Sequence, residues 1–400
     1  MDQHRGFLHP TTHADADPAA PQGRTGNATT ATCTIKGNKK IQVTFYPAHP
    51  PRVSYFCFYC SGVESSPFDD EPKIIATDAN FVLLRVSFGS GNAMIGYDQS
   101  DYYIYNADVP SLEQLPHPRP YVGLLSRGKK SYTVVALRDD ASAYFRGSSV
   151  PGEFDVCLFH SEDMVWTTKA VTVPPNQQRK NNSEEFRHGT TKVITVGGEG
   201  GTMAFVDIQR GMLIYDVLFG DPMLRYIMLP QQPQEISPHQ RILNHSASIA
   251  RDVALVQGSF KFVEVATIMS RASGVHNKCY DVDSWMKAIS SRDESWSQGR
   301  KVLSTNITVD SNLLPEGNSP RDIEYLLIGH PMHSLHDDVV YVMAKFESCD
   351  SRAWIMAVDM MSGKLREINE FNAERTYGFR LTYTNSRISK HLKMSPGNYN

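Results

Sequence analysis

The sequence predicts an all-β protein built as a β-propeller-like ring of stacked sheets. Three stretches, 81–116, 133–175 and 193–230, each begin with a short apolar strand and end on an aliphatic residue followed by proline. Two more strands of the same kind follow at 253–256 and 339–342. Short strands punctuated by Gly, Pro, Asn and Asp recur along the chain, whereas few segments have a helical period. A recurring unit of this length indicates stacked β-modules, none of which can bury its apolar face alone.

The expected elements follow one another from residue 41 onward. They are β-branched and aromatic in character and are separated by turn residues. The expected strands are 41–45, 53–58, 81–86, 102–105, a strand from Tyr132, 154–159, 165–168, 193–196, 204–208, 211–216, 253–256, 339–342 and a flanking strand within 378–388. One short helix is expected over 282–289, whose apolar residues recur at helical spacing.

The number of blades follows from the size of the unit. A four-stranded blade with its connections takes about 40 to 50 residues. Five opening strands, together with flanking strands at 41–60 and 378–388, fit about six blades, with five or seven as alternatives. A blade that joins N-terminal and C-terminal strands would close the ring and leave no exposed sheet edge. A pair of β-sandwiches is the competing architecture, and it explains the recurrence less well.

One domain is expected over 33–390, between a disordered tail at 1–32 and a flexible C-terminus at 391–400. The tail has few large apolar residues and repeated Pro and Gly. The chain shows neither the apolar region of a signal peptide nor an apolar stretch long enough to span a membrane. Six unevenly spread cysteines fit a reducing compartment. We therefore expect a cytoplasmic or nuclear protein that is neither secreted nor membrane-spanning.

The charge balance gives no electrostatic reason to expect a nucleic acid or an anionic membrane as partner. The net charge is −3 at pH 7, and the sequence pI is about 6.5. The basic clusters at 127–130 and 179–180 are short and have no interleaved aromatic residues, so solvated loops are expected there.

Three histidines, His330, His333 and His336, are the candidate metal ligands. Imidazole is a common zinc ligand, but no Cys or Glu stands at an obvious ligand offset beside them. Loop histidines without a metal are the simpler interpretation. The sequence therefore assigns no catalytic residue, no cofactor and no definite metal site.

Two further motifs have structural interpretations. Cys57 and Cys60 have the spacing of half a zinc ribbon or of a redox pair, but they would face opposite sides of a strand, so buried thiols are expected. The glycine-rich run 197–201 lacks the Lys and Ser/Thr of a phosphate-binding loop and precedes a strand-like segment, so a β-hairpin turn is expected. The four tryptophans, at positions 166, 285, 296 and 354, are expected to anchor the core, with a binding hot spot at one of them as the alternative.

From Val193 onward the residues resemble a family expanded in grasses and defined by domain of unknown function 1618. The resemblance is densest over 190–345. It is carried by Val196-Gly197-Gly198, Phe205-Val206-Asp207, Arg210-Gly211-Met212-Leu213, Asp216-Val217-Leu218, Asp221-Pro222, Arg251-Asp252-Val253, Lys261-Phe262-Val263-Glu264, the Trp285 and Trp296 segment and Asp337-Asp338-Val339-Val340-Tyr341. The resemblance implies a plant intracellular protein of β-rich architecture and implies no activity.

Two functions remain open on the sequence. The favoured hypothesis is a non-enzymatic module that binds another protein, in a regulatory or adaptor role, because propellers present a broad face lined by loops. The alternative is an enzyme or small-ligand receptor whose site lies in the central channel, where residues distant in sequence converge. The identity of the partner and the oligomeric state do not follow from the sequence.

Overall fold

The computed structural model of the chain consists almost entirely of strands, which confirms the all-β prediction. The helical elements among the described residues, α2 (Pro175–Gln178), α3 (Ala247–Ala250) and η6 (Ile388–Lys390), have four residues at most, and none of them is long and apolar enough to cross a membrane. The structure describes residues 7–13, 26–35, 37–48, 51–61, 68–88, 100–116, 121–139, 151–178, 186–231, 239–242, 247–270, 277–289, 295–304, 307, 326–347, 350, 352–372, 384–386 and 388–392.

The strands of the described residues form six sheets, four with four strands and two with five. The chain divides into two compact units. One unit consists of Met1–Phe205, Ile214–Arg225 and Tyr383–Asn400, and the other of Val206–Leu213 and Tyr226–Thr382. The boundary passes through one sheet, which consists of β13 (Lys192–Gly197), β14 (Thr202–Asp207), β15 (Gly211–Asp216) and β16 (Arg225–Met228).

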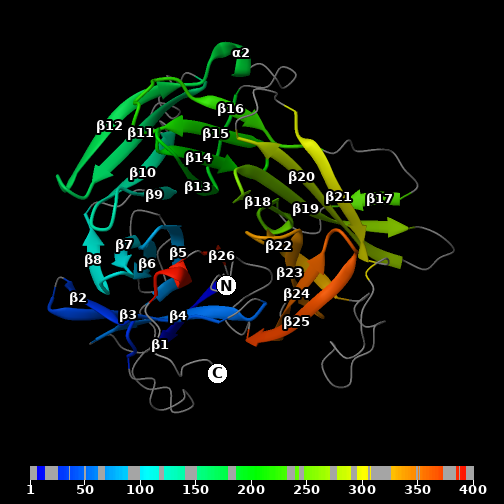
Figure 1. Ribbon diagram of the computed structural model, residues 1–400, viewed down its shortest axis with the longest axis horizontal. Coiled ribbons are helices and arrows are strands. Elements are labelled where there is room, and N and C mark those ends of the chain that lie inside the picture. Colours follow the sequence, from blue (N-terminus) through cyan, green and yellow to red (C-terminus); the bar gives the residue numbers. More distant parts are fainter. Residues whose placement is uncertain are drawn as a thin grey trace. The chain divides into compact units, whose positions relative to one another are not determined.

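The first unit contains three complete sheets (Figure 1). The first sheet has the order β2 (Ala31–Ile35), β3 (Lys39–Tyr46), β4 (Val53–Cys60), β1 (Phe7–His13), β26 (Thr384–Asn385). The second has the order β5 (Phe68–Asp78), β6 (Phe81–Phe88), β7 (Ser100–Asn106), β8 (Ser111–Leu115). The third has the order β12 (Val165–Thr172), β11 (Glu153–His160), β10 (Tyr132–Asp139), β9 (Val122–Ser126).

Both ends of the sequence contribute to the first sheet. β1 runs parallel to β4, and β26 pairs antiparallel with β1. β1 and the start of β2 lie within 1–32, the segment expected to be a disordered tail, so these parts of the segment form strands instead. Residues 1–6 and 14–25, the remainder of that segment before Gly26, and 393–400 of the expected flexible C-terminus lie outside the described residues.

The sheet β5–β8 is buried on both faces, which explains the nearly continuous apolar run of β6. Val82 and Leu84 belong to a cluster with residues of the sheet β1–β4, whereas Phe81 and Leu83 belong to a cluster with residues of the sheet β9–β12. A strand covered on both sides loses the alternation of apolar and polar residues that marks a half-exposed strand. The three sheets of this unit therefore stack face to face.

The second unit contains two complete sheets with a shared core. One has the order β17 (His239–Ile242), β19 (Ser259–Ser270), β20 (Asn277–Ala288), β21 (Ser297–Leu303), with β18 (Arg251–Val256) also paired to β19. The other, drawn in orange in Figure 1, has the order β22 (Leu327–His333), β23 (Val339–Lys345), β24 (Arg352–Asp359), β25 (Lys364–Asn372). Val263 and Val282 of the first sheet and Val342 and Met356 of the second share one cluster.

The helix expected over 282–289 is wrong, because residues up to Ala288 belong to strand β20. Val282 packs in the core shared with the sheet β22–β25. Trp285 stands directly opposite Phe262 of β19, with ring centroids 5.2 Å apart. Both faces of β20 carry buried residues, so the period of two that identifies a strand is not visible in its apolar pattern.

Candidate functional site

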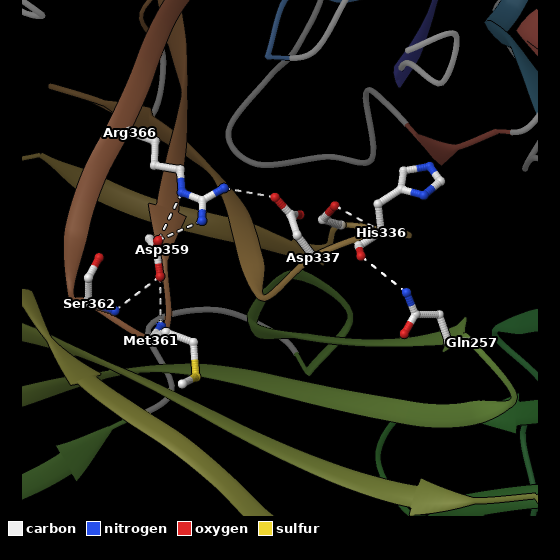
Figure 2. Close-up of polar contacts among 8 residues, drawn as sticks. Gln257, His336, Asp337, Asp359, Met361, Ser362 and Arg366 are labelled. Atoms are coloured by element: carbon white, nitrogen blue, oxygen red, sulfur yellow. Dashed lines mark hydrogen bonds and ion pairs between the residues drawn. The ribbon is translucent and has the colours of Figure 1, made fainter. Parts of the chain in front are cut away.

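The best-defined polar site is a loop cluster at one end of the sheet β22–β25. It consists of the turn 334–338 between β22 and β23, the turn 360–363 between β24 and β25, and the charged residues that hold them, Asp359 and Arg366 (Figure 2). Gln257, from the turn between β18 and β19, and Lys261 of β19 contact the same turns. The cluster lies wholly within the second unit.

Asp359 organises the turn between β24 and β25. One carboxylate oxygen accepts hydrogen bonds from the backbone N–H groups of Met361 and Ser362, at 2.8 and 3.0 Å. The other accepts from Nε and Nη2 of Arg366, at 2.9 and 2.7 Å. The Ser362 N–H and the Arg366 guanidinium lower the pKa of Asp359 to about 2, although burial opposes this shift. Asp359 is therefore an ionised anchor of the turn.

Arg366 joins the two turns. While two of its nitrogens bind Asp359, its Nη1 donates to Asp337 in the turn between β22 and β23, at 2.8 Å. The hydrogen bond to Asp359 is the main cause that raises the pKa of Arg366. A planar guanidinium can hold two carboxylates at once in this way, which a lysine ammonium does less well.

The turn 334–338 is held at three more points. Lys261 forms an ion pair with Asp338 at 2.8 Å, and the Asp338 carbonyl accepts from the Met360 N–H at 2.8 Å. Gln257 donates to the carbonyl of His336 at 3.2 Å.

Burial, and next the charge of Asp337, raise the pKa of Tyr341 to about 12, so this tyrosine stays neutral at physiological pH.

The three candidate histidines lie on this loop cluster or on the strand before it. His330 is buried in β22, at a register irregularity and with a φ of 49°, and His333 is buried at the end of the same strand. His336 is exposed in the turn. Across the part of the chain that the structure describes, no group of three or more His, Cys, Asp or Glu side chains could hold a metal ion.

The cysteine pair, the glycine-rich run and the basic cluster at 127–130 lie in a strand or in turns. Cys60 is buried and Cys57 is half-buried on strand β4, whose burial alternates residue by residue, and neither of these two cysteines forms a disulfide. The run 197–201 connects β13 to its neighbour β14, which confirms the hairpin turn. Residues 127–130 form an exposed turn between β9 and β10, and 179–180 lie outside the described residues.

Sequence reasoning missed Asp359 and Arg366, the two residues that organise the loop cluster. A signal was present, since Asp359 is followed by Ser362 and Gly363 between two apolar strands, a composition typical of a turn. The sequence could not show that Arg366 binds both Asp359 and Asp337. These contacts depend on how β25 lies beside the turn after β22.

The charge of Asp359 is expected to make stability depend on pH. The pKa of Asp359 in the folded chain is about 2, below the ordinary value of 3.8. Ionised Asp359 therefore contributes to the free energy of unfolding above pH 3.8, and this contribution is lost as the pH falls towards 2. Asp359→Asn is expected to lower the free energy of unfolding by about 1 to 2 kcal/mol at neutral pH, with the difference from wild type shrinking in acid. Urea unfolding at a series of pH values measures this difference.

The control for this measurement is Asp338→Asn, which removes an exposed carboxylate that pairs with Lys261. Its effect is expected to stay below about 1 kcal/mol, as for other surface ion pairs. A constant gap between Asp359→Asn and wild type across the acid range would contradict the assigned role of the Asp359 charge.

Comparison with known proteins supports one family relationship. Residues 205–341 match the family described as "Protein of unknown function (DUF1618)", about one third of the chain. This match confirms the resemblance found from the sequence. No curated protein matches the chain.

Two solved structures have a low similarity to the chain. A protein of unknown function from Dyadobacter fermentans DSM 18053 has 10% identity and a TM-score of 0.32, with 75% of this chain and 81% of that chain covered. The GH32 beta-fructofuranosidase BmSUC1 from Bombyx mori has 9% identity and a TM-score of 0.29, with 79% of this chain and 62% of that chain covered. Over residues 205–341 the chain is thus similar to the family described as "Protein of unknown function (DUF1618)".

Proposed function

We propose that the protein is a non-enzymatic module that binds another protein and that its sheets are the blades of a β-propeller-like ring of about six. Six sheets, and in most of them strands that are consecutive in the chain, support this architecture. The burial of sheet β5–β8 on both faces also fits a blade packed between two others. The DUF1618 resemblance adds the expectation of a plant intracellular protein, and the regulatory or adaptor role follows from the propeller analogy alone.

The observation that carries the proposal is the exposed Met361 on the loop cluster. Its side chain is 57% exposed, although its own backbone N–H is fixed by Asp359. The Met361 side chain points away from Arg366 and Asp337, which together with Asp359 form the charged part of the same loop cluster (Figure 2). Methionine and arginine are enriched in protein interfaces, and a turn that is ordered before binding loses less entropy when a partner docks.

A photo-crosslinking amino acid at position 361, in the full chain expressed in its native tissue, tests the proposal. We expect a covalent adduct with a single partner protein, identified by mass spectrometry. The matched control is Met164, a methionine 51% exposed in the turn after β11, where no such adduct is expected. Purified partner should then bind Met361→Glu at least about tenfold more weakly than wild type, as expected for a central interface residue. Equal adducts at both positions, or none at 361, would contradict the proposal.

A further inference from the structure

A second surface, in the first unit, combines exposed apolar side chains with carboxylates. We name it the acidic apolar patch and define it by Leu218, Phe219, Glu199, Asp216 and Asp221. Phe219 is 68% exposed and Leu218 is 45% exposed, in the turn that follows β15. Met223, five residues after Leu218, is also exposed. Large apolar side chains grouped at the surface mark interaction sites more often than single ones do.

The turn that carries Leu218 and Phe219 is held against the glycine-rich hairpin turn. The Leu218 N–H donates to the Gly200 carbonyl at 2.9 Å. A Cβ at Gly200 would lie 3.0 Å from the Phe219 ring, and one at Gly201 would lie 2.9 Å from Leu218. The glycines therefore let both apolar side chains lie close to the hairpin backbone. The patch is ordered by its own chain and does not need a partner to form.

Three carboxylates accompany the apolar residues. Glu199 lies exposed at the tip of the hairpin turn, and Asp221 is exposed just after Phe219 and Gly220. Asp216 is half-buried, accepts from the Thr202 hydroxyl, and would lie 3.2 Å from a Cβ at Gly200. Burial, and next the charges of Asp221 and Asp216, raise the pKa of the nearby Tyr215.

A positively charged side chain contacts this turn, and its ammonium group already forms a hydrogen bond there. The ammonium of Lys169, on the edge strand β12, donates to the Gly220 carbonyl. The acidic apolar patch therefore offers apolar contact at its centre and carries an excess of negative charge. An anionic membrane or a nucleic acid would be repelled by these carboxylates, whereas a cationic segment would be attracted.

We propose that the acidic apolar patch is the docking site for a segment of a partner protein in which an apolar side chain is flanked by Lys or Arg. The apolar side chain packs on Phe219 and Leu218, and the flanking cations pair with Glu199, Asp216 and Asp221. Complementary charge of this kind steers the encounter and selects the partner, while the aromatic contact supplies most of the affinity. This site goes beyond the loop cluster, belongs to a different unit, and does not depend on it.

The test is selection of displayed random short peptides on the full-length protein, followed by affinity measurement with labelled synthetic copies. We expect the selected peptides to share an apolar residue next to Lys or Arg and to bind more weakly as salt is raised. Phe219→Ala is expected to weaken binding at least about tenfold, and Asp221→Asn by several-fold. Val109→Ala is the matched control, because Val109 is also 68% exposed but lies in the turn between β7 and β8.

The inference would be overturned if no peptide were selected, or if the selected peptides were acidic or uncharged. It would also be overturned if Phe219→Ala did not change the affinity for the selected peptides, or if Val109→Ala lowered that affinity as much as Phe219→Ala does. Concentration-dependent dimerisation that Phe219→Ala abolishes would also overturn it, in favour of a second copy of this chain as the occupant. Circular dichroism and thermal unfolding of each variant separate a lost contact from a lost fold. An absence of crosslinking at Met361 would leave this result unaffected, so the two proposals fail independently.

Discussion

Glu264→Ala is expected to lower the free energy of unfolding by about 3 to 5 kcal/mol. Glu264 stands opposite Arg251 on the paired strands β19 and β18, with Oε2 2.6 Å from the Arg251 Nε. The side chain of Glu264 is 1% exposed and that of Arg251 is 10% exposed. Removing the carboxylate leaves the buried guanidinium without its ion-pair partner. Urea unfolding followed by tryptophan fluorescence measures the loss.

The chain supplies a matched control for this pair. Arg138 and Asp155 also stand opposite each other on antiparallel strands, β10 and β11, at the same distance of 2.6 Å, but with side chains 47% and 26% exposed. Asp155→Ala is expected to cost less than about 1 kcal/mol, because water screens this pair. The double variant Arg251→Met with Glu264→Leu should recover most of the loss, since it removes both buried charges. Similar losses for Glu264→Ala and Asp155→Ala would show that burial does not set the energetics of these pairs.

In chain order, the last strand of a sheet could be predicted from the sequence better than the first strand. β8 ends at Leu115 before Pro116, and β12 and β16 each end just before an aliphatic residue followed by proline. Proline cannot donate a hydrogen bond to a neighbouring strand, so a proline that follows an apolar strand and an aliphatic residue favours the end of that strand.

The first strands of two sheets were missed because the recurring apolar run is not where these sheets begin. The stretches that begin at residues 81 and 133 start with β6 and β10, which are inner strands of their sheets. β5 and β9 precede them, and β5 contains Asp69, Asp70, Glu71 and Pro72, a composition typical of a loop. An inner strand buried on both faces has a strong apolar signal, whereas a strand at the sheet end does not.

The loop cluster could be located only in part from the sequence. The expectation of loop histidines holds only for His336, which lies in the turn before β23. His330 and His333 are instead buried in strand β22. The contact between Arg366 and Asp337 joins residues 29 positions apart, and no local pattern encodes it. Leu218 and Phe219 were also not recognised as a surface, because apolar residues next to a strand normally indicate burial.

Phe262→Ala is expected to lower the free energy of unfolding by about 3 to 5 kcal/mol, because it leaves a cavity among aromatic side chains. Phe262 is fully buried on β19, with ring centroids 5.2 Å from Trp285 and 6.3 Å from Trp296. The Arg251 guanidinium lies 6.0 Å from the centre of its ring. Truncation removes one partner from both tryptophans and from the cation–π contact. Urea unfolding, together with the fluorescence emission of the folded variant, measures both consequences.

Two controls separate the cavity from the general loss of a phenylalanine. Phe262→Leu keeps most of the volume and is expected to cost about 1.5 kcal/mol or less. Phe346, in the turn after β23, is 39% exposed, and its ring centroid lies 5.3 Å from that of Trp354. Phe346→Ala is therefore expected to lower the free energy of unfolding by only about 1 kcal/mol. If Phe262→Ala cost no more than Phe346→Ala, the aromatic group on β19 and β20 would not be a principal source of stability. The fluorescence emission of folded Phe262→Ala should also move to longer wavelength, because Trp296 loses its apolar neighbour. The indole N–H of Trp296 still donates to the Met228 carbonyl at 2.8 Å.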